Sequence, residues 1–238
     1  GCVCDDLKLT IADGRVVGVS PGCVLAEPWL LGQSTSDGPS CSIGGQAVSM
    51  DEAVEHAAGL LAGSTSPLIY GLSGSSTPGQ RSAVHLADTI GACIDTTAST
   101  CHAPSIVALQ NVGESTCSLG EIRNRSDLVI YWGSNPSKSH PRHMERFVDA
   151  PGQYVPAGRS ARHVVVVDVK ASESSQRADT FIQIEPGSDF EVLWALRGLV
   201  RGLPLDASAV GSVPRKTLID LAERMKQCRY GAAFFGLG

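Results

Sequence analysis

A run of four consecutive valines between His163 and Asp168 constrains the fold more than any other feature of the chain. A strand that is apolar at every position must be covered on both faces, which is typical of the interior of a parallel sheet. Residues 127–132 (DLVIYW) have the same character. Because parallel strands need long crossover connections, which are usually helices, the sequence predicts an α/β fold.

Further helices and strands alternate along the chain. Ser49 and Glu52 predict a capping box at the start of a helix that Gly63 ends. Residues 67–71 predict a short buried strand, and residues 81–92 predict a helix that follows it. The residues expected on the inner face of that second helix are Val84, Ala87 and Ile90.

The same alternation continues toward the C-terminal end. Residues 181–184 and 230–235 predict strands, and residues 215–227 predict a helix. Ser188 and Glu191 predict a second capping box. The helix that follows this box is expected to have a core face formed by Phe190, Val192, Leu193, Leu196 and Leu199.

Two cysteines flank a predicted β-hairpin near the beginning of the chain. Apolar and polar residues alternate on both sides of the tight-turn pair Asp13 and Gly14, which predicts two short antiparallel strands. Cys4 precedes the first strand and Cys23 follows the second, so the hairpin returns both thiols to one end. Such a pair suits a zinc ion or an iron–sulfur cluster, with two more ligands from elsewhere. A pair of buried apolar cysteines explains the spacing equally well.

Composition excludes several classes of protein. Of the 238 residues, 42% are hydrophobic and 18% are charged, which is typical of a globular protein. The net charge of -5 argues against nucleic acid as a partner, and no apolar run is long enough to span a membrane. Eight cysteines without a signal peptide favour reduced thiols, so we expect a cytoplasmic protein. The missing initiating Met and the strand-like ending lead us to expect a piece of a longer chain.

Cys101 and His102 are the strongest candidates for chemistry. They follow a polar segment, and Pro104 and Ser105 predict the start of a helix that runs to Gln110. A helix N-terminus favours the thiolate, so Cys101 is a candidate nucleophile or soft metal ligand. An ordinary buried cysteine beside a surface histidine is the alternative. A Cys–His hydrolase is a weaker one, because adjacent residues seldom point at each other as nucleophile and base must.

Small and polar residues follow the predicted strands where a ligand would bind. In an open parallel sheet, ligands collect beyond the carboxyl ends of the strands. Asp168 stands at one such end and can accept hydrogen bonds from a ribose or a base edge. His140 and His143 are expected to be solvated or to contact phosphate. The turn after residues 127–132 consists of Gly133, Ser134, Asn135 and Pro136. A possible phosphate cradle, or simply a well-capped helix start, consists of Pro186, Gly187, Ser188 and Asp189.

Taken together, these segments resemble the molybdopterin oxidoreductase superfamily. The resemblance is greatest to the B subunits of tungsten or molybdenum formylmethanofuran dehydrogenase. The segments that carry it, in the family's order, are CDD with its hairpin and returning Cys, TASTCHAPSIVALQNVG, LGEIRNRSDLVIYWGSNPSKSHPRHMERF, VVVVD and PGSDFEVLWALR. The resemblance implies a hairpin region over residues 1–45 and Rossmann-like parallel layers over residues 46–238, incomplete at the C-terminus.

The resemblance also implies roles for particular residues. Cys101 matches the cysteine that ligates tungsten or molybdenum, and His102 matches the active-site histidine. Cys4 and Cys23 match the third and fourth ligands of a 4Fe-4S cluster, whose first two cysteines would precede Gly1. The residues that match segments holding the molybdopterin guanine dinucleotides are Gly133, Ser134, Asn135, Pro136, Asp168, Lys170, Gly187, Ser188 and Asp189.

The implied activity is the reversible oxidation of formate to carbon dioxide. The amidohydrolase-type A subunit of the same complex would connect formate with formylmethanofuran. Two departures from the family pattern make an alternative a serious one: Ala103 stands where Gly is common, and Val169 and Lys170 stand where Pro-Arg is usual. The retained Cys101–His102 pair argues for the redox subunit. The alternative is a non-redox, structural B subunit of the bacterial formyltransferase/hydrolase complex.

Overall fold

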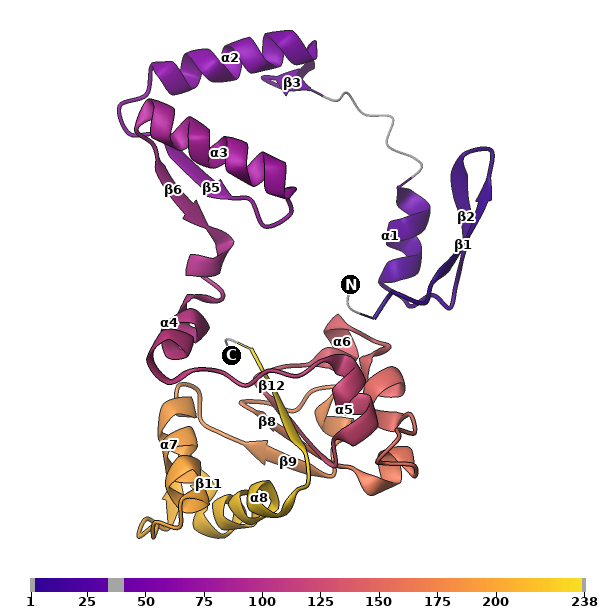
Figure 1. The fold of residues 1–238 in the computed structure, drawn as a ribbon, viewed down its shortest axis with the longest axis vertical. Helices are drawn as coiled ribbons and strands as arrows, with labels where there is room; N and C mark the ends of the chain where they lie inside the picture. Colours follow the sequence, from indigo (N-terminus) through magenta and orange to yellow (C-terminus); the bar gives the residue numbers. More distant parts are fainter. Residues whose placement is uncertain (1–2, 34–40, 237–238) are drawn as a thin grey trace. The chain divides into compact units, whose positions relative to one another are not determined.

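The chain divides into two compact units. A computed structural model describes residues 3–33 and 41–236. The first unit, called the sheet unit below, combines residues 1–34 with residues 116–238, and the second, called the inserted unit, is formed by residues 35–115 (Figure 1).

A four-stranded parallel sheet forms the centre of the sheet unit. Its strand order is β12-β7-β8-β9, and each neighbouring pair is parallel. The strands are β7 (Leu128–Trp132), β8 (His163–Asp168), β9 (Thr180–Gln183) and β12 (Gly231–Phe235). All residues of β7 and the four valines of β8 are buried. The predicted parallel α/β sheet with its two fully apolar strands is therefore confirmed.

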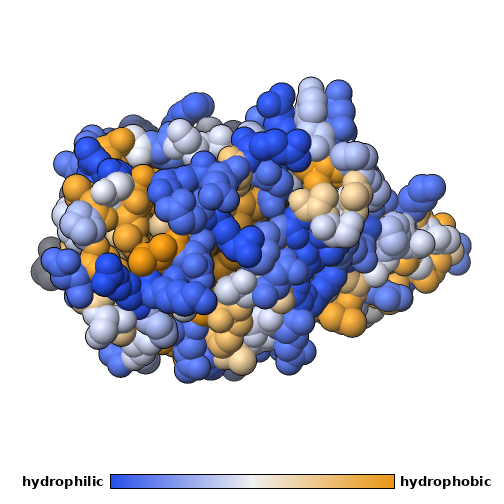
Figure 2. Space-filling view, turned by 90° about the horizontal axis from the view of Figure 1, so that it is seen from below, coloured by the Kyte–Doolittle hydropathy of each residue, from blue (hydrophilic) through white to orange (hydrophobic). Residues whose placement is uncertain are grey.

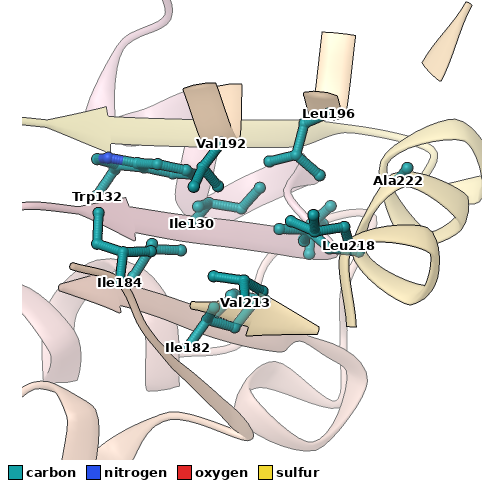
Figure 3. Packing of buried hydrophobic residues seen from close by; sticks show 13 residues of the cluster. Ile130, Trp132, Ile182, Ile184, Val192, Leu196, Val213, Leu218 and Ala222 are labelled. Carbon is teal, nitrogen blue, oxygen red and sulfur yellow. The ribbon is translucent and has the colours of Figure 1, made fainter. Parts of the chain in front are cut away.

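Alternate residues of the central strands enter two separate cores. Leu128, Ile130 and Trp132 of β7 pack with one cluster, while Val129 and Tyr131 pack with the other. The first cluster is covered by α7 (Asp189–Val200) and α8 (Arg215–Gln227), as Figure 3 shows for Val192, Leu196, Leu218 and Ala222. The second lies against α5 (Leu119–Arg125) and the π-helix η2 (Met144–Asp149). Helices on both faces explain why these strands carry no polar side.

The core face predicted for α7 is only partly right. Val192 and Leu196 are buried, but Phe190 and Leu193 are exposed by 69% and 47%. The ring of Phe190 instead stacks on Trp194, another exposed side chain of the same helix. Figure 2 shows one face of the molecule, on which hydrophobic areas lie between larger hydrophilic ones.

Of the two capping boxes predicted at helix N-termini, one is confirmed and one is wrong. The box at α2 (Met50–Ala62) is confirmed, since Ser49 Oγ accepts from the Glu52 N–H at 3.2 Å and Glu52 Oε2 accepts from the Ser49 N–H at 3.0 Å. The box expected at Ser188 is wrong, because its hydroxyl donates backward to the Glu185 carbonyl at 2.7 Å. A box between Ser118 and Glu121 begins α5 and was not predicted.

The N-terminal hairpin is present as predicted. It is formed by the antiparallel strands β1 (Lys8–Ala12) and β2 (Arg15–Ser20). Asp13 and Gly14 both have positive φ, as a two-residue hairpin turn requires. Smaller elements of the sheet unit are α1 (Ala26–Gly32), α6 (Pro136–Ser139), η3 (Gly158–Ala161), η4 (Ser175–Arg177), β10 (Ala209–Val210) and β11 (Val213–Pro214).

The inserted unit contains a second, smaller parallel sheet. Strands β5 (Leu68–Gly71) and β6 (Cys93–Thr96) pair in parallel and are connected by α3 (Thr77–Ile90). The strand predicted at residues 67–71 is present and Pro67 is buried, but the predicted burial of the strand itself is wrong, because Leu68 is 60% and Tyr70 is 49% exposed. Within the described residues this sheet consists of two strands, and no residue of β5 is fully buried.

The helix α3 begins earlier than predicted and buries less. Ser76 caps it, and Val84, expected on the inner face, is 48% exposed, whereas Ala87 is buried. The other elements of this unit are β3 (Ser42–Ile43), β4 (Gln46–Ala47), η1 (Thr97–Ser99) and α4 (Ala103–Val112). In the described ranges of both units, helices that could cross a membrane are absent.

Candidate functional site

Cys101 and His102 lie in the inserted unit just before α4. The Cys101 N–H donates to the Ala98 carbonyl at 3.1 Å, which closes a turn after η1, and His102 is the N-cap residue of α4. The predicted helix start at this point is confirmed. Both side chains are exposed and the Cys101 thiol is free, so the alternative of an ordinary buried cysteine does not hold.

The two residues line an open pocket of about 520 Å³. The pocket forms at the carboxyl ends of β5 and β6, with walls that include Ser73, Gln80 and Thr96. Gln80 fixes the loop after β5, because its amide donates to the carbonyls of Leu72 and Ser75 at 3.1 and 3.2 Å. Leu72 itself has a φ of 68°, a backbone conformation that side chains with a Cβ rarely adopt and that occurs often at functional sites.

A second group of predicted residues lies at the carboxyl edge of the large sheet. Gly133 has a φ of 55° and its N–H donates to the Val167 carbonyl at 2.9 Å, so the turn after β7 begins beside β8. Asp168 ends β8, and its Oδ1 accepts from the Val169 N–H at 2.7 Å. Gly187, with a φ of 81°, precedes α7.

Two of the residues expected to contact a cofactor, Asn135 and Asp189, form side-chain hydrogen bonds within the protein. Asn135 Oδ1 accepts from Ser174 Oγ at 2.7 Å, and Asn135 Nδ2 donates to Glu173 Oε2 at 2.6 Å. Asp189 Oδ1 accepts from the indole N–H of Trp132 at 2.6 Å. These bonds connect the turn after β7 with the loop after β8 and with the start of α7. Sequence patterns gave no signal for Ser174 or Trp132 as partners.

Two buried hydroxyl groups at this edge lack hydrogen-bond partners among the described residues. They are Ser134 Oγ and Ser137 Oγ, on either side of the Asn135–Pro136 step. Buried polar groups are nearly always satisfied, so an unsatisfied pair indicates a missing polar partner. Such a partner at the carboxyl edge of a parallel sheet is compatible with a phosphate- or ribose-bearing ligand.

Cys4 and Cys23 line one pocket in the sheet unit. This pocket of about 460 Å³ has mostly apolar walls, including Leu7, Leu9 and Trp29. Both thiols are free and half-buried, and Cys23 Sγ accepts from the Ala26 N–H at 3.4 Å. Two cysteines that line one cavity are suited to supply two of the four ligands of an iron–sulfur cluster. In the described ranges, no three Cys, His, Asp or Glu side chains come together as a metal site. The pair would therefore be only part of a ligand set.

The expectation for His143 as a solvated or phosphate-contacting group is wrong. His143 is 4% exposed, and its Nε2 lies 2.9 Å from the Tyr131 hydroxyl, in the core between β7 and η2. Burial, with a smaller effect of His140, lowers the pKa of His143 to about 4, so the ring is neutral near pH 7. His140 is half-buried, and it lines the pocket of Cys4 and Cys23.

The fold and these residues define the class of the protein. It is an α/β protein with candidate ligand-binding residues at the carboxyl edges of its parallel sheets and with free cysteines in two pockets. Over its entire length, the chain is similar to the B subunits of two tungsten-containing formylmethanofuran dehydrogenases. It is 36% identical to the B subunit of tungsten-containing formylmethanofuran dehydrogenase 2 of Methanocaldococcus jannaschii, in an alignment of 253 residues that covers 100% of this chain and 57% of the relative. The chain therefore spans little more than half of that relative's length. No protein-family model matches the sequence.

Two further comparisons extend this relation. Formate dehydrogenase H of Escherichia coli is 32% identical over 106 residues, which covers 43% of this chain and 14% of that enzyme. Among solved structures, a chain of the formyltransferase/hydrolase complex FhcABCD from Methylorubrum extorquens, solved with methylofuran, superposes with a TM-score of 0.61 and 25% identity. That match covers 79% of this chain and 49% of the solved chain.

Proposed function

We propose that the chain is part of the B subunit of a formylmethanofuran dehydrogenase that interconverts formate and carbon dioxide. The observation that carries the proposal is the free, exposed Cys101 thiol beside His102 in an open pocket. A cysteine with this exposure at a helix N-terminus is suited to ligate a soft metal. The names of the relatives, a tungsten-containing dehydrogenase and a formate dehydrogenase, support the same chemistry.

In this proposal each thiol site has a distinct task. When bound, tungsten or molybdenum with its molybdopterin guanine dinucleotides would supply the two-electron chemistry. Cys101 would be the protein ligand of that metal, and His102 would hold or move a proton at its imidazole. Cys4 and Cys23 would supply two ligands of a 4Fe-4S cluster, and the apolar pocket walls would shield their thiolates from water.

The carboxyl edge of the large sheet would bind the dinucleotide portion. The hydroxyls of Ser134 and Ser137 lack partners among the described residues and are candidates for polar contacts there. Asp168 would accept from a ribose, and Lys170 would contact phosphate as a point charge rather than a forked guanidinium. Gly133, Pro136, Gly187 and Ser188 would shape the backbone around the ligand. Asn135 and Asp189 would act indirectly, because their side chains already hold this edge together.

Partners are expected from the same comparisons. The dehydrogenase relatives are subunits by name, and the solved chain comes from a complex of four kinds of subunit. We therefore expect the chain to act together with an amidohydrolase-type A subunit, which would link formate to the formyl group carried by the furan cofactor.

A second candidate function has specific support. The structural neighbour belongs to a formyltransferase/hydrolase complex, and Ala103 and Lys170 depart from the residues usual in the dehydrogenase. A methyl group beside Cys101 reduces the room for a metal, and a lysine loses the bidentate contact of an arginine. In that case the chain would be a structural B subunit without redox chemistry.

Reduction of a dye by formate, catalysed by the purified full-length complex, tests the dehydrogenase proposal. We expect the wild-type complex to be active and Cys101→Ser to lose at least about 99% of the activity, because the metal loses its protein ligand. Cys93→Ser is the matched control, since Cys93 is another exposed, free cysteine of the inserted unit. A wild-type complex that never reduces the dye but transfers formyl groups would support the structural role instead.

A further inference from the structure

One buried arginine connects the hairpin region with the main sheet of its unit. Arg142 is 8% exposed and lies between α6 and η2. Its Nη1 and Nη2 donate to the two carboxylate oxygens of Asp6, each at 2.7 Å. This is a bidentate, charge-assisted pair, which is the strongest geometry open to an arginine. The pair joins residues 136 positions apart in the sequence.

The same guanidinium also binds the chain next to both pocket cysteines. Nη1 reaches the carbonyl of Val3 at 3.4 Å and the carbonyl of Pro21 at 3.3 Å. Val3 directly precedes Cys4, and Pro21 lies two residues before Cys23. A single side chain, from the segment between α6 and η2, therefore contacts both of the segments that carry the thiols.

The remaining contacts fix the guanidinium itself. Its Nε donates to Glu145 Oε1 at 3.0 Å. Next along η2, Arg146 Nη1 forms an ion pair with Asp5 Oδ1 at 2.5 Å. Removing one partner of a buried charge is costly because the other charge is left uncompensated.

We propose that Arg142 is a positioning residue that holds Cys4 and Cys23 at the spacing at which they bind one metal centre. The guanidinium acts as a clamp on the two cysteine segments, and the thiols are a preformed pair before any ligand arrives. That this centre is an iron–sulfur cluster rests on the function proposed above, whereas the clamp itself rests on the contacts of Arg142.

Cross-linking of the two thiols tests the clamp. The full-length complex, in a Cys2→Ala background and stripped of iron by a chelator, is treated with dibromobimane, which bridges neighbouring thiols. The Cys4–Cys23 product is quantified by peptide mass spectrometry. We expect Arg142→Gln to lower its yield about tenfold relative to wild type, which corresponds to about 1.4 kcal/mol. Arg142→Lys should lower it as well, since a lysine cannot make the bidentate pair and reach both carbonyls.

Two further variants distinguish the loss of the clamp from a general loss of folding. Arg159→Gln is the matched control: Arg159 pairs with Asp179 at 2.9 Å and donates to two carbonyl groups, but touches neither cysteine segment. Asp6→Asn keeps Arg142 but removes the negative charge and replaces one of the two acceptor oxygens with an amide donor, which breaks the bidentate pair. The clamp predicts a lower yield with Asp6→Asn and an unchanged yield with Arg159→Gln. Equal yields in Arg142→Gln and wild type, or an equal loss in Arg159→Gln, would overturn it.

The iron content of the untreated complex distinguishes failure of the cluster assignment from failure of the Arg142 clamp. If wild type contains iron, the Arg142→Gln complex should show a weaker or shifted electron paramagnetic resonance signal of the reduced cluster, and an unaltered signal counts against the clamp. If wild type contains no iron, the cluster assignment fails, and the cross-linking yields alone decide whether Arg142 positions the thiols.

Discussion

His143, which pairs with Tyr131, is buried although the neighbouring residues in the sequence are mostly polar. The segment SHPRHMERF is rich in polar and charged residues, yet His143 and Arg142 are both buried. His143 also meets the ring of Phe234 edge-on at 5.0 Å, while Tyr131 stacks on the same ring at 5.1 Å. A histidine in this setting is a core residue with a hydrogen bond.

Burial of neutral His143 makes stability depend on pH. The pKa is about 4 in the folded chain against 6.5 in the unfolded one, so the unfolded state takes up a proton that the folded state does not. Stability therefore falls as the pH drops from about 6.5 toward 4. Between pH 7 and pH 5 we expect His143 to account for a loss of about 2 kcal/mol in the free energy of unfolding.

Urea unfolding at the two pH values measures this effect. His143→Gln keeps a hydrogen-bonding group for Tyr131 but cannot titrate, so its loss between pH 7 and pH 5 should be smaller than that of wild type by about this amount. His56→Gln, at an exposed histidine of α2, should behave like wild type. A wild-type pH dependence that His143→Gln leaves unchanged would show that this histidine is not buried as neutral imidazole.

For single residues, the candidate chemical role could be predicted from the sequence, but contacts with residues far apart in the sequence could not. The candidate role of Cys101 follows from its residue type and from the helix start after it, both of which are local. The clamp of Arg142 on Asp6 joins parts of the chain that only the folded structure brings together. No local pattern marks Ser134 and Ser137 as buried hydroxyls that lack partners in the described part of the chain either.

At the scale of elements, strong and continuous patterns gave correct predictions. The strands β7 and β8 were found because their apolar runs are continuous, and the helix α8 was found because its apolar residues recur at helical spacing. The strand β6 was missed, since Asp95 and Thr96 occupy half of its four positions. The burial predicted for β5 was wrong because a short apolar run does not show whether other elements cover the faces of the sheet.

Close packing of the loop at Gly152 against α5 gives a test at this scale. A Cβ at Gly152 would lie 1.9 Å from the Arg123 carbonyl oxygen and 2.8 Å from Asn124 Cα. Both are backbone atoms, so the loop or the helix must move. We expect Gly152→Ala to lower the free energy of unfolding by about 1–3 kcal/mol, measured by urea denaturation.

For Gly120, in contrast, we expect an alanine substitution to raise the stability. It lies within α5, and the nearest atom to a Cβ there is Ser118 Oγ at 3.8 Å. Gly120→Ala should therefore raise stability by about 0.5–1 kcal/mol, because alanine is the better helix former. If both alanine variants change stability equally, the close approach at Gly152 is not a feature of the protein in solution.

At the scale of the whole molecule, the residues of the proposed function are divided between the two units. Cys101 and His102 belong to the inserted unit, whereas the sheet edge and the Cys4–Cys23 pocket belong to the sheet unit. The segment order along the chain supported the family resemblance, which the relatives confirm over the full length of this chain. The division itself was not apparent from composition, because both units have mixed α/β patterns.

The metal and pterin content of the full-length protein, purified with its partner subunits, distinguishes a redox subunit from a structural one. We expect tungsten or molybdenum near stoichiometry together with pterin, and loss of the metal in Cys101→Ser but not in Cys93→Ser. A complex that contains neither metal nor pterin, yet still transfers and hydrolyses formyl groups, would contradict the redox role and give this chain a structural role.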